Sequence, residues 1–246
     1  FDGHVYKKHG PEVECVINSN GSKMVDSIHD VLVKCGIKDG MTVSFHHHFR
    51  EGDYVVNMVM KEIHDMGIKD ITICASSLGK AHDPLVEYIE DGTITNIQSS
   101  GVRGKIGEAI SNGKLKGLAI MRSHGGRVRA LVTGETQIDI AFIGTPTCDE
   151  YGNCRGIGGK SDCGVLSYAM SDAFHANKVV AITDCMVPFP NFPAVKNSAS
   201  SLPALWPKNR ACSSLTNPQA VWTGKTCHGW RRRWKPRRRT DAASCS

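Results

Sequence analysis

The feature that most constrains the fold is a regular alternation of short apolar runs with segments of helical periodicity. Residues 22–35 and 52–66 carry apolar side chains three and four positions apart, the spacing of one helix face, with Ser22 a candidate N-cap for the first. Short apolar runs over 42–45 and 71–75 have the length of strands. Helices that alternate with strands favour a mostly parallel sheet with helices on both faces. The sequence therefore predicts an α/β fold.

The alternation continues as far as residue 183. Further strands are predicted over 94–97, 118–121, 128–132, 138–143 and 179–183, and further helices over 83–91, 105–112 and 166–176. The strands over 128–132 and 138–143 are joined by a short turn with Gly134, and if they pair as a hairpin the sheet is mixed. In open α/β sheets, ligands bind beyond the carboxyl ends of the strands, so functional residues are expected in the loops that follow the strands.

The net charge of +6 does not describe the body of the chain. Residues 196–246 hold eleven of the 30 lysines and arginines and a single acid, Asp241, which leaves a net charge of −4 over residues 1–195. A mildly acidic body argues against a nucleic-acid-binding protein. No apolar run approaches the roughly 20 residues that span a membrane. The start at Phe1 shows no signal peptide, so we expect a cytoplasmic protein with some upstream sequence missing.

The last fifty or so residues differ in composition from the rest. All four tryptophans lie there (Trp206, Trp222, Trp230, Trp234), with two runs of three arginines at 231–233 and 237–239, whereas Val, Ile, Leu and Phe number only four. So few apolar side chains cannot form a packed core, and we predict a disordered tail over 196–246. Our hypothesis is a reading-frame shift or a mispredicted gene end, and the alternative is a genuine basic arm for nucleic acid or a membrane. The chain is accordingly divided into an N-terminal extension (1–21), an α/β domain (22–195) and this tail.

The cysteine pattern indicates thiols. Seven of the ten cysteines lie in the body at irregular spacings, and several sit inside apolar runs. Without a secretory signal, this pattern is typical of reduced, buried side chains. Zinc ligands come in pairs roughly two to four residues apart. Cys148, Cys154 and Cys163 are more widely spaced, so no metal site is predicted.

Four predicted loops that follow strands carry clusters of polar residues. His46-His47-His48-Phe49-Arg50 comes first, followed by 99–105, 122–127 and 144–153. Glycines let backbone N–H groups approach a ligand closely, and His, Arg and Lys neutralise carboxylates or phosphates. We therefore expect a polyanionic ligand. Because side chains alternate along an extended chain, the three histidines are poor joint metal ligands, and a carboxylate-binding loop is weighed against structural hydrogen bonding.

Three other motifs are less specific. Residues 156–161 (Gly-Ile-Gly-Gly-Lys-Ser) match neither a P-loop nor a dinucleotide-binding loop, and their amides either bind an anion or belong to a glycine-rich connection. Ser123 and His124 point to opposite faces of a strand, which leaves His124 a positioning or acid/base role and Ser123 no nucleophilic one. Asp149-Glu150-Tyr151-Gly152-Asn153 has the composition of a turn, in which we expect solvated carboxylates.

Taken in order, these segments resemble one family. The stretch 40–60, with Gly-Met-Thr-Val-Ser-Phe-His-His-His-Phe-Arg at 40–50, is similar to the signature of the citrate lyase alpha chain. Ser100-Gly101-Val102-Arg103-Gly104-Lys105 and the segments 123–128, 148–153, 159–161 and 187–194 follow in the same order. The resemblance covers roughly residues 22–194, and it is specific because several long, unusual segments agree. The family has a second transferase domain after the first, and here the likeness stops near Ala194.

The resemblance implies a CoA-transferase-like α/β fold of the NagB-RpiA type and a cytoplasmic transferase. The thioester of an acyl-carrier protein, or of CoA as a model substrate, passes from acetate to citrate. A partner lyase subunit then cleaves the citryl thioester to oxaloacetate and acetyl-carrier protein. The implied partners are citrate, the acetyl-acyl-carrier protein (gamma subunit) and the lyase beta subunit, with neither nucleic acid nor membrane. The chain itself is expected to bind no cofactor, the carrier's prosthetic group or CoA entering as substrate.

Citrate carries up to three carboxylates, and the matching segments supply cations and amides for them. The expected binding residues are His46, His48, Arg50, Arg103, Lys105 and Arg127, with the backbone at Gly158 and Gly159. The expected catalytic groups are His124, Gly125 and Gly126, since glycine amides at 125–126 or 158–159 can hold the oxyanion of a thioester under attack. No covalent glutamate can be matched. The alternatives are a CoA-transferase for another small carboxylic acid, a sugar-phosphate isomerase, and a non-catalytic chain that only binds partner subunits.

Overall fold

A parallel sheet forms the centre of the molecule. The computed structural model describes residues 24–46, 49, 53–189, 191 and 218–223. In this part of the chain the sheet has eight strands in the order β1-β10-β9-β6-β2-β3-β4-β5, and neighbouring strands are parallel throughout. The strands are β1 (Met24–Val25), β2 (Thr42–Phe45), β3 (Ile71–Ala75), β4 (Ile94–Ser99), β5 (Ala119–Met121), β6 (Ile138–Gly144), β9 (Ala176–Thr183) and β10 (Pro218–Thr223). A separate antiparallel pair is formed by β7 (Thr147–Cys148) and β8 (Cys154–Arg155).

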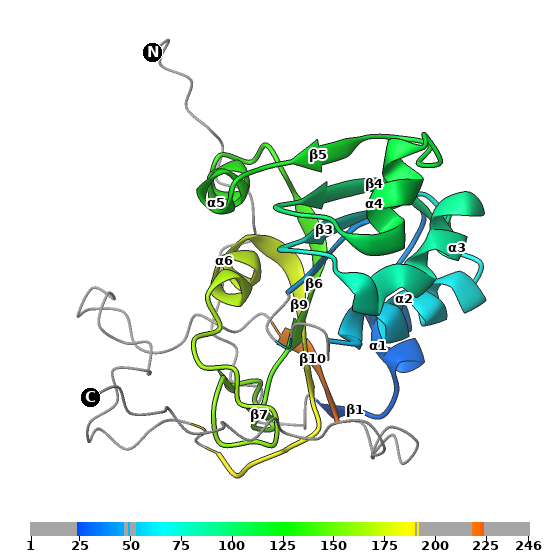
Figure 1. Cartoon of the computed structure of the whole chain (residues 1–246). Coiled ribbons are helices and arrows are strands. Elements are labelled where there is room, and N and C mark those ends of the chain that lie inside the picture. The colour runs from blue at the N-terminus through cyan, green and yellow to red at the C-terminus, as the bar shows by residue number, and fades with distance from the viewer. Residues whose placement is uncertain (1–23, 47–48, 50–52, 190, 192–217, 224–246) are drawn as a thin grey trace, which may run out of the picture.

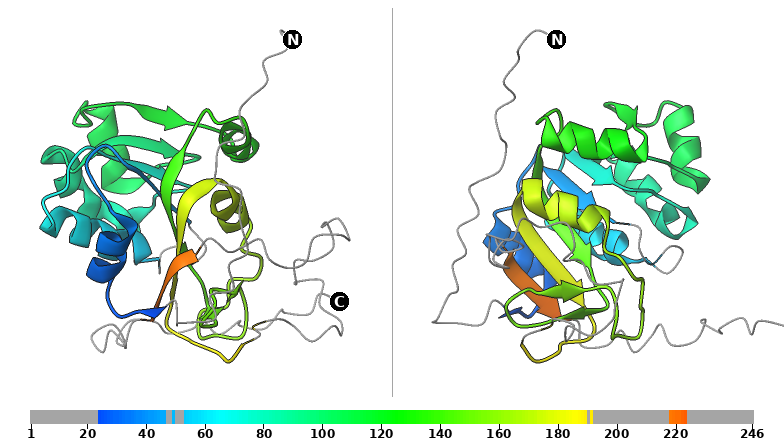
Figure 2. Two further views of the ribbon diagram at one scale, coloured as in Figure 1. Left: turned by 180° about the vertical axis from the view of Figure 1, so that it is seen from behind. Right: turned by 90° about the vertical axis from the view of Figure 1, so that its left-hand side faces the viewer.

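Helices cover both faces of the sheet. They are α1 (Ile28–Cys35), α2 (Val55–Asp65), the 3₁₀-helix η2 (Lys80–Leu85), α3 (Val86–Glu90), α4 (Gly104–Ser111), α5 (His124–Val132) and α6 (Tyr168–His175). The first group, α1 to α4, lies on one side, whereas α5 and α6 lie on the other, as both views from the front and from behind show (Figures 1 and 2). The predicted α/β class, with a parallel sheet between two helical layers, is confirmed.

The central strand β6 shows why the sheet is buried on both faces. Ile140 and Phe142 pack into the core beneath α1 to α4, and the Phe142 ring stacks on Phe45 with centroids 5.5 Å apart. The alternate residues Ala141 and Ile143 pack into the second core beneath α5 and α6. Because both faces are covered, residues 140–143 of the strand form a continuous apolar run rather than an alternating one.

The helices of the first layer follow from local sequence signals. In α2, Val56, Val59, Met60 and Ile63 are buried at intervals of three and four residues, as the periodicity predicts. In α1, the N-cap is Ser27, whose hydroxyl accepts the Asp30 N–H at 3.0 Å. The predicted cap at Ser22 lies outside the described residues, and the helix begins at Ile28, because β1 occupies the preceding residues.

One predicted strand is wrong. Residues 128–132 are mostly apolar and include two β-branched valines, Val128 and Val132, but they form the second half of helix α5. Ser123 caps this helix by accepting the Gly126 N–H at 3.1 Å, and Arg127, Ala130 and Leu131 are buried at helical spacing. The predicted hairpin with 138–143 therefore does not form, and the sheet is parallel rather than mixed.

Smaller differences concern element ends and the C-terminal segment. The helix predicted to open at Asp83 begins as η2 and continues as α3, with Pro84 inside the 3₁₀ turn. In the segment 196–246, predicted to be disordered, the structure describes β10, which lies between β1 and β9. Its backbone pairs with both neighbours, and Val221 and Trp222 belong to residue types that favour strands. The rest of that segment and the predicted extension 1–21 lie outside the described residues.

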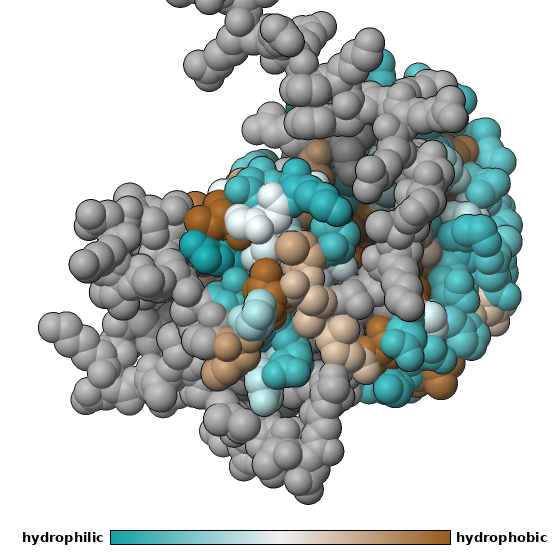
Figure 3. All heavy atoms as spheres, turned by 90° about the horizontal axis from the view of Figure 1, so that it is seen from below, coloured by the Kyte–Doolittle hydropathy of each residue, from teal (hydrophilic) through white to brown (hydrophobic). Residues whose placement is uncertain are grey.

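The surface of the described part is mixed in polarity. On the face shown in Figure 3, hydrophobic residues form patches between hydrophilic ones. None of the helices among the described residues is both long and apolar enough to cross a membrane.

Candidate functional site

The strand order reverses direction between two neighbouring strands, β2 and β6. From β2 the chain moves outward through β3, β4 and β5, and then returns to β6 on the other side of β2. Ligands of open parallel sheets bind where the strand order reverses in this way. His46 follows the end of β2, and Thr145 follows the end of β6. The first predicted binding loop therefore begins at the switch point of the sheet.

The start of this loop packs tightly against β6. A Cβ at Gly144 would lie 2.8 Å from Phe49 Cε2 and 3.2 Å from Val55 Cγ2, so a larger residue would displace the Phe49 ring. The loop and the first turn of α2 thus rest on the end of β6. Two of the predicted binding residues in this loop, His48 and Arg50, lie outside the described residues.

A buried ion cluster joins the switch point to the second helical layer; it consists of His46, Arg127 and Asp172. Arg127 of α5 donates from Nη1 and Nη2 to the two oxygens of Asp172 in α6, each over 2.6 Å. Asp172 Oδ2 lies 3.5 Å from His46 Nε2, and all three side chains are almost completely buried. Burial opposes the guanidinium charge, but the hydrogen bonds and charge of Asp172 outweigh it and raise the pKa of Arg127.

This cluster changes the role expected for Arg127. It was predicted to bind a substrate carboxylate, but its fork is occupied by an internal carboxylate. Two predicted site residues, His46 and Arg127, are brought together through Asp172, which the sequence reasoning missed. A signal was present, because Asp172 is a lone acid on the apolar face of α6 formed with Ala169 and Ala173.

Tyr168 links the buried cluster to the exposed start of α5. The Arg127 guanidinium carbon lies 5.6 Å from the centre of the Tyr168 ring, within cation–π range. The ring of His124 meets the same tyrosine edge to face at 5.4 Å between centroids. Burial raises the pKa of Tyr168 although Arg127 acts in the opposite direction. The exposed His124 thus contacts, edge to face, the same aromatic ring that lies against Arg127 of the ion cluster.

The two glycines after His124 differ in what their amides do. The Gly126 N–H donates to Ser123 Oγ at 3.1 Å as part of the N-cap, so it is engaged within the protein. Gly125 is exposed, and a Cβ there would meet nothing within 4 Å. Of the predicted oxyanion donors at 125–126, Gly125 is therefore the one that a ligand can approach.

Arg103 and Lys105 lie where the sequence placed them, after β4. Arg103 is the N-cap residue of α4, and its backbone N–H donates to Leu78 O at 3.0 Å while its side chain is exposed. The Lys105 N–H donates to Asp83 Oδ1 at 2.9 Å, and its side chain is also exposed. Both cations are held at the start of a helix by backbone hydrogen bonds, with charged ends that face solvent.

The glycine-rich segment around Gly158 and Gly159 is an internally bonded loop. The Gly159 N–H donates to Asp162 Oδ1 at 2.9 Å, and a Cβ at Gly159 would collide with the Pro146 carbonyl oxygen. The exposed Gly158 has a φ of +92°, a conformation that favours glycine. Close backbone packing accounts for Gly159, whose amide already has an internal acceptor.

A small hollow lies between α5 and the strands β3 and β4. It is lined by Cys74, Gln98, Ser99, Arg122, Arg127, Ala130 and Thr136. Arg122 donates to Gln98 Oε1 at 3.0 Å and pairs with Glu135 at 2.7 Å. Burial raises the pKa of the Cys74 thiol to about 11, so the thiol is neutral at pH 7. The hollow adjoins the ion cluster, because Arg127 belongs to both.

Asp53 is a buried acid that the sequence reasoning did not single out. It precedes α2, is 1% exposed, and accepts the Val55 N–H at 3.2 Å. Burial raises its pKa to about 7 despite that hydrogen bond. Its backbone carbonyl lies 3.1 Å from His82 Nε2, and His82 Nδ1 accepts the Gly79 N–H at 3.0 Å. These two bonds require the neutral His82 tautomer with its proton on Nε2.

The carboxylate of Asp149, expected to be solvated, is fully buried. It accepts the N–H groups of Tyr151 and Asn153 at 3.0 Å each, the Asn153 side-chain amide at 2.8 Å, and the Asn191 N–H at 3.0 Å. The prediction failed because an Asp in a turn can gather several nearby N–H groups and so replace its water shell. Asp149 thus fixes the β7–β8 turn and joins it to Asn191.

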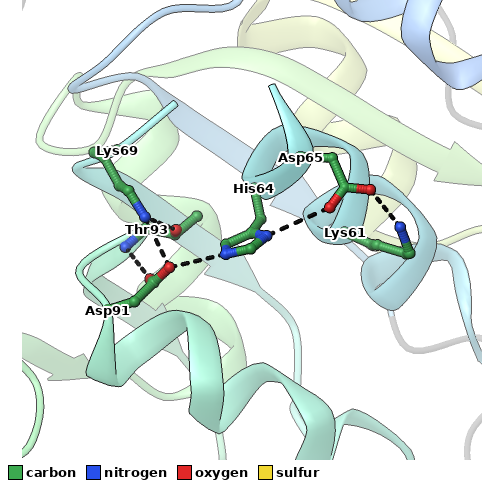
Figure 4. Close-up of polar contacts among 6 residues, drawn as sticks. All are labelled: Lys61, His64, Asp65, Lys69, Asp91 and Thr93. Atoms are coloured by element: carbon green, nitrogen blue, oxygen red, sulfur yellow. Dashed lines mark hydrogen bonds and ion pairs between the residues drawn. The ribbon is translucent and has the colours of Figure 1, made fainter. Parts of the chain in front are cut away.

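A second charged cluster lies at the opposite edge of the sheet. Near the C-terminal end of α2, His64 Nε2 lies 3.0 Å and Lys69 Nζ 2.7 Å from Asp91 Oδ2 (Figure 4). Burial opposes the Asp91 charge, but the Lys69 hydrogen bond and the two bonds from Thr93 lower the pKa of Asp91 to about 2. Since β3 and β4 begin here, this network joins helix ends to the amino edge of the sheet, away from the loops at its carboxyl edge.

Fold and site together define an open parallel α/β protein with polar residues in the loops at the carboxyl edge of its sheet. The chain matches the family model "Citrate lyase, alpha subunit" over residues 21–200, so it belongs to the citrate lyase alpha subunit family. It is 50% identical over 172 residues to the citrate lyase alpha chain of Klebsiella pneumoniae, an alignment that covers 70% of this chain and 34% of that relative. The resemblance seen in the sequence is therefore confirmed.

Two solved structures support the fold. One, from Streptococcus mutans and described as the alpha subunit of citrate lyase in complex with citrate, has 45% identity and a TM-score of 0.76, over 89% of this chain and 39% of that one. The other is an acyl-CoA transferase from Escherichia coli O157:H7 with 14% identity and a TM-score of 0.54, over 83% of this chain and 50% of that one, which shows a shared fold alone. The chain spans about a third of the length of the curated relatives it matches.

Proposed function

We propose that the chain acts in the transferase reaction of citrate lyase, moving the thioester of an acyl-carrier protein or of CoA from an acetyl group to citrate. The observation that carries this proposal is the family match over residues 21–200, which contains every predicted site residue. The related Streptococcus mutans structure holds citrate, which supports citrate as the acid.

The chemistry requires cations for citrate and a donor for a developing oxyanion. In the exchange, the C–S bond of the acetyl thioester breaks and a C–S bond to citryl forms, with acetate released. Negative charge gathers on the carbonyl oxygen of the thioester under attack, and preorganised N–H donors stabilise it. Lys105 and Arg103 offer exposed positive charge, and Gly125 offers an exposed amide at the start of α5.

The partners follow from the same assignment. A carrier protein that bears an acetyl thioester supplies the acyl group, and CoA thioesters can replace it as simpler substrates. A lyase subunit receives the citryl thioester and cleaves it to oxaloacetate and acetyl thioester. We place this reaction in the cytoplasm.

The direct test mixes the purified chain with acetyl-CoA and citrate and follows citryl-CoA by mass spectrometry. Citryl-CoA should accumulate with time and with citrate concentration. Glutarate or a hydroxyacid offered in place of citrate, with the corresponding CoA thioester followed by mass, tests the alternative of a transferase for another small acid. A folded chain that forms no citryl-CoA would contradict the proposal for this chain.

Matched variants test whether the site lies at the carboxyl edge. Lys105→Ala and Lys114→Ala remove exposed lysines near opposite ends of α4, of which only Lys105 lies beyond the end of β4. His124→Ala and Arg129→Ala form a second pair: both residues are exposed on α5, with His124 at the start of the helix and Arg129 in its last turn. We expect lower kcat/KM for citrate in the first member of each pair and little change in the second. Equal losses of kcat/KM in both members of a pair would contradict a site at the carboxyl edge.

A further inference from the structure

Two cysteines face each other across the β7–β8 pair. Cys148 in β7 is directly opposite Cys154 in β8, and their sulfur atoms are 3.8 Å apart. Among the cysteines that the structure describes, these two are the pair whose sulfurs lie within contact distance. The sequence spacing of six residues concealed this proximity, because it depends on the tight turn that Asp149 holds between the strands.

The backbone places the pair at a site suited to a covalent link. The Cys148 N–H donates to Cys185 O at 3.2 Å, and the Cys148 carbonyl accepts the Val187 N–H at 3.0 Å, so its hydrogen bonds point away from β8. The next pair, Asp149 and Asn153, is bonded through Asp149 N–H and Asn153 O at 3.3 Å. Cys148 and Cys154 therefore form a non-hydrogen-bonded pair, in which Cα atoms are about 4.5 Å apart and side chains are closest. A disulfide accepts Cα separations of roughly 4.4–6.8 Å.

The two thiols differ in access. Cys148 is fully buried against Ala181, whereas Cys154 is partly exposed. The Cys154 hydrogen bond and burial raise the pKa of the Cys148 thiol, so it is the poorer first nucleophile. An oxidant from solvent therefore reaches Cys154 first, and the buried Cys148 sulfur lies within contact distance of it.

We propose that Cys148 and Cys154 form a dithiol site that peroxides convert to an intrachain disulfide. The Cys154 thiolate attacks a peroxide oxygen, the O–O bond breaks, and for hydrogen peroxide one water leaves as Cys154 becomes a sulfenic acid. Cys148 sulfur then attacks the sulfenic sulfur, and its proton leaves with the hydroxyl as a second water. The two thiols lose two electrons and the peroxide gains them. The product covalently joins β7 to β8.

The test titrates the reduced, folded chain with hydrogen peroxide, blocks the remaining thiols by alkylation and digests with a glutamyl endopeptidase. Cleavage after Glu150 separates the two cysteines, so a disulfide leaves two peptides joined until a reductant is added. We expect this linked product at low peroxide, with an intact mass lower by two hydrogen atoms. Thiol reductant should restore the mass.

Variants decide between this pair and other thiols. Cys154→Ser should lose the linked product, whereas Cys163→Ser, which alters another partly exposed cysteine packed against the same core as Cys154, should keep it. Cys148→Ser should leave a sulfenic acid on Cys154 that a dimedone probe captures; if that variant fails to fold, Cys154→Ser carries the test. The proposal is overturned if Cys148 and Cys154 stay reduced while other thiols oxidise, or if the disulfide involves Cys163 or Cys185.

Discussion

Arg127 and Asp172 form a bidentate ion pair in the interior, with both terminal nitrogens of the guanidinium 2.6 Å from separate carboxylate oxygens. The pair links α5 to α6 on the face of the sheet opposite α1 to α4 (Figure 1). It also lies beside His46, the first residue after β2. The geometry of the second helical layer and of the switch point therefore depends on one buried charge pair.

The first prediction concerns the loss of one partner. Asp172→Asn keeps the size of the side chain but leaves the Arg127 charge buried without a counter-ion, which costs about 3–5 kcal/mol. We expect the free energy of unfolding in urea to fall by that amount. Citryl-CoA formation should also fall, since His46 loses the carboxylate next to its Nε2.

Its control lies two residues along the same helix. Arg129 also pairs with an acid, Glu135, but their side chains are 64% and 44% exposed, and such pairs contribute about 1 kcal/mol or less. Arg129→Ala should therefore be nearly neutral. The double variant Arg127→Met/Asp172→Leu removes both charges and should recover much of the stability lost in Asp172→Asn. A single variant as stable as the unmodified chain would show that the pair is dispensable.

The second prediction is a pH dependence that arises from Asp53. Its pKa is about 7 in the folded chain and 3.8 as the unperturbed value, so the folded state holds the proton more tightly. The resulting stabilisation is complete below about pH 4 and is lost as the pH rises to about 7, on the order of 4 kcal/mol in all. Asp53→Asn stays neutral, and it should become more stable relative to the unmodified chain over that interval.

Urea unfolding measured from pH 4 to pH 8 tests this dependence. The exposed Asp184→Asn is the matched control, and its stability should run parallel to that of the unmodified chain at every pH. If the gap between the Asp53→Asn variant and the unmodified chain does not widen with pH, Asp53 is ionised in the fold and the prediction is wrong.

The sequence predicted the elements whose periodicity is strong. The spacing over 52–66 and the apolar runs at 71–75 and 138–143 correspond to α2, β3 and β6. It failed at 128–132, because β-branched residues that favour strands also fit a helix once Ser123 caps it and tertiary packing buries Ala130 and Leu131. At this segment, tertiary packing of the apolar face determines the secondary structure more than local propensity does.

The candidate site was predictable in place but not in detail. Because ligands of parallel sheets bind beyond the strand ends, the sequence predicted site residues at His46, Arg103 and His124. The structure places all three after the carboxyl ends of β2, β4 and β5. Which cation is exposed and which is paired internally depends on residues distant in sequence. Arg127 contacts Asp172, 45 residues further along the chain; the pattern around Asp172 indicates a buried acid, but it does not identify Arg127 as the partner.

The third prediction concerns the turn between β7 and β8. Asp149→Asn replaces one carboxylate oxygen with an NH₂ group, and in either orientation of the amide that group faces backbone N–H donors. Hydrogen bonds to charged groups contribute about 1.5–3 kcal/mol, so we expect a loss of about 2–3 kcal/mol in urea unfolding. Glu150→Gln, one residue further and exposed, should change stability little. Equal effects would mean that the Asp149 carboxylate is solvated, as the composition of the turn first indicated.

The last prediction distinguishes two candidate caps for α1. Ser27 Oγ accepts the Asp30 N–H at 3.0 Å and donates to the Asp30 carboxylate at 2.6 Å, and its backbone is extended as an N-cap requires. Ser27→Ala removes both bonds and should cost about 1 kcal/mol in the free energy of unfolding. Ser22→Ala, at the position that the apolar periodicity favoured, should cost much less because the helix begins at Ile28. If Ser22→Ala causes the larger loss, the helix starts five residues earlier than the structure has it, and residues 24–25 cannot pair with β10 as β1.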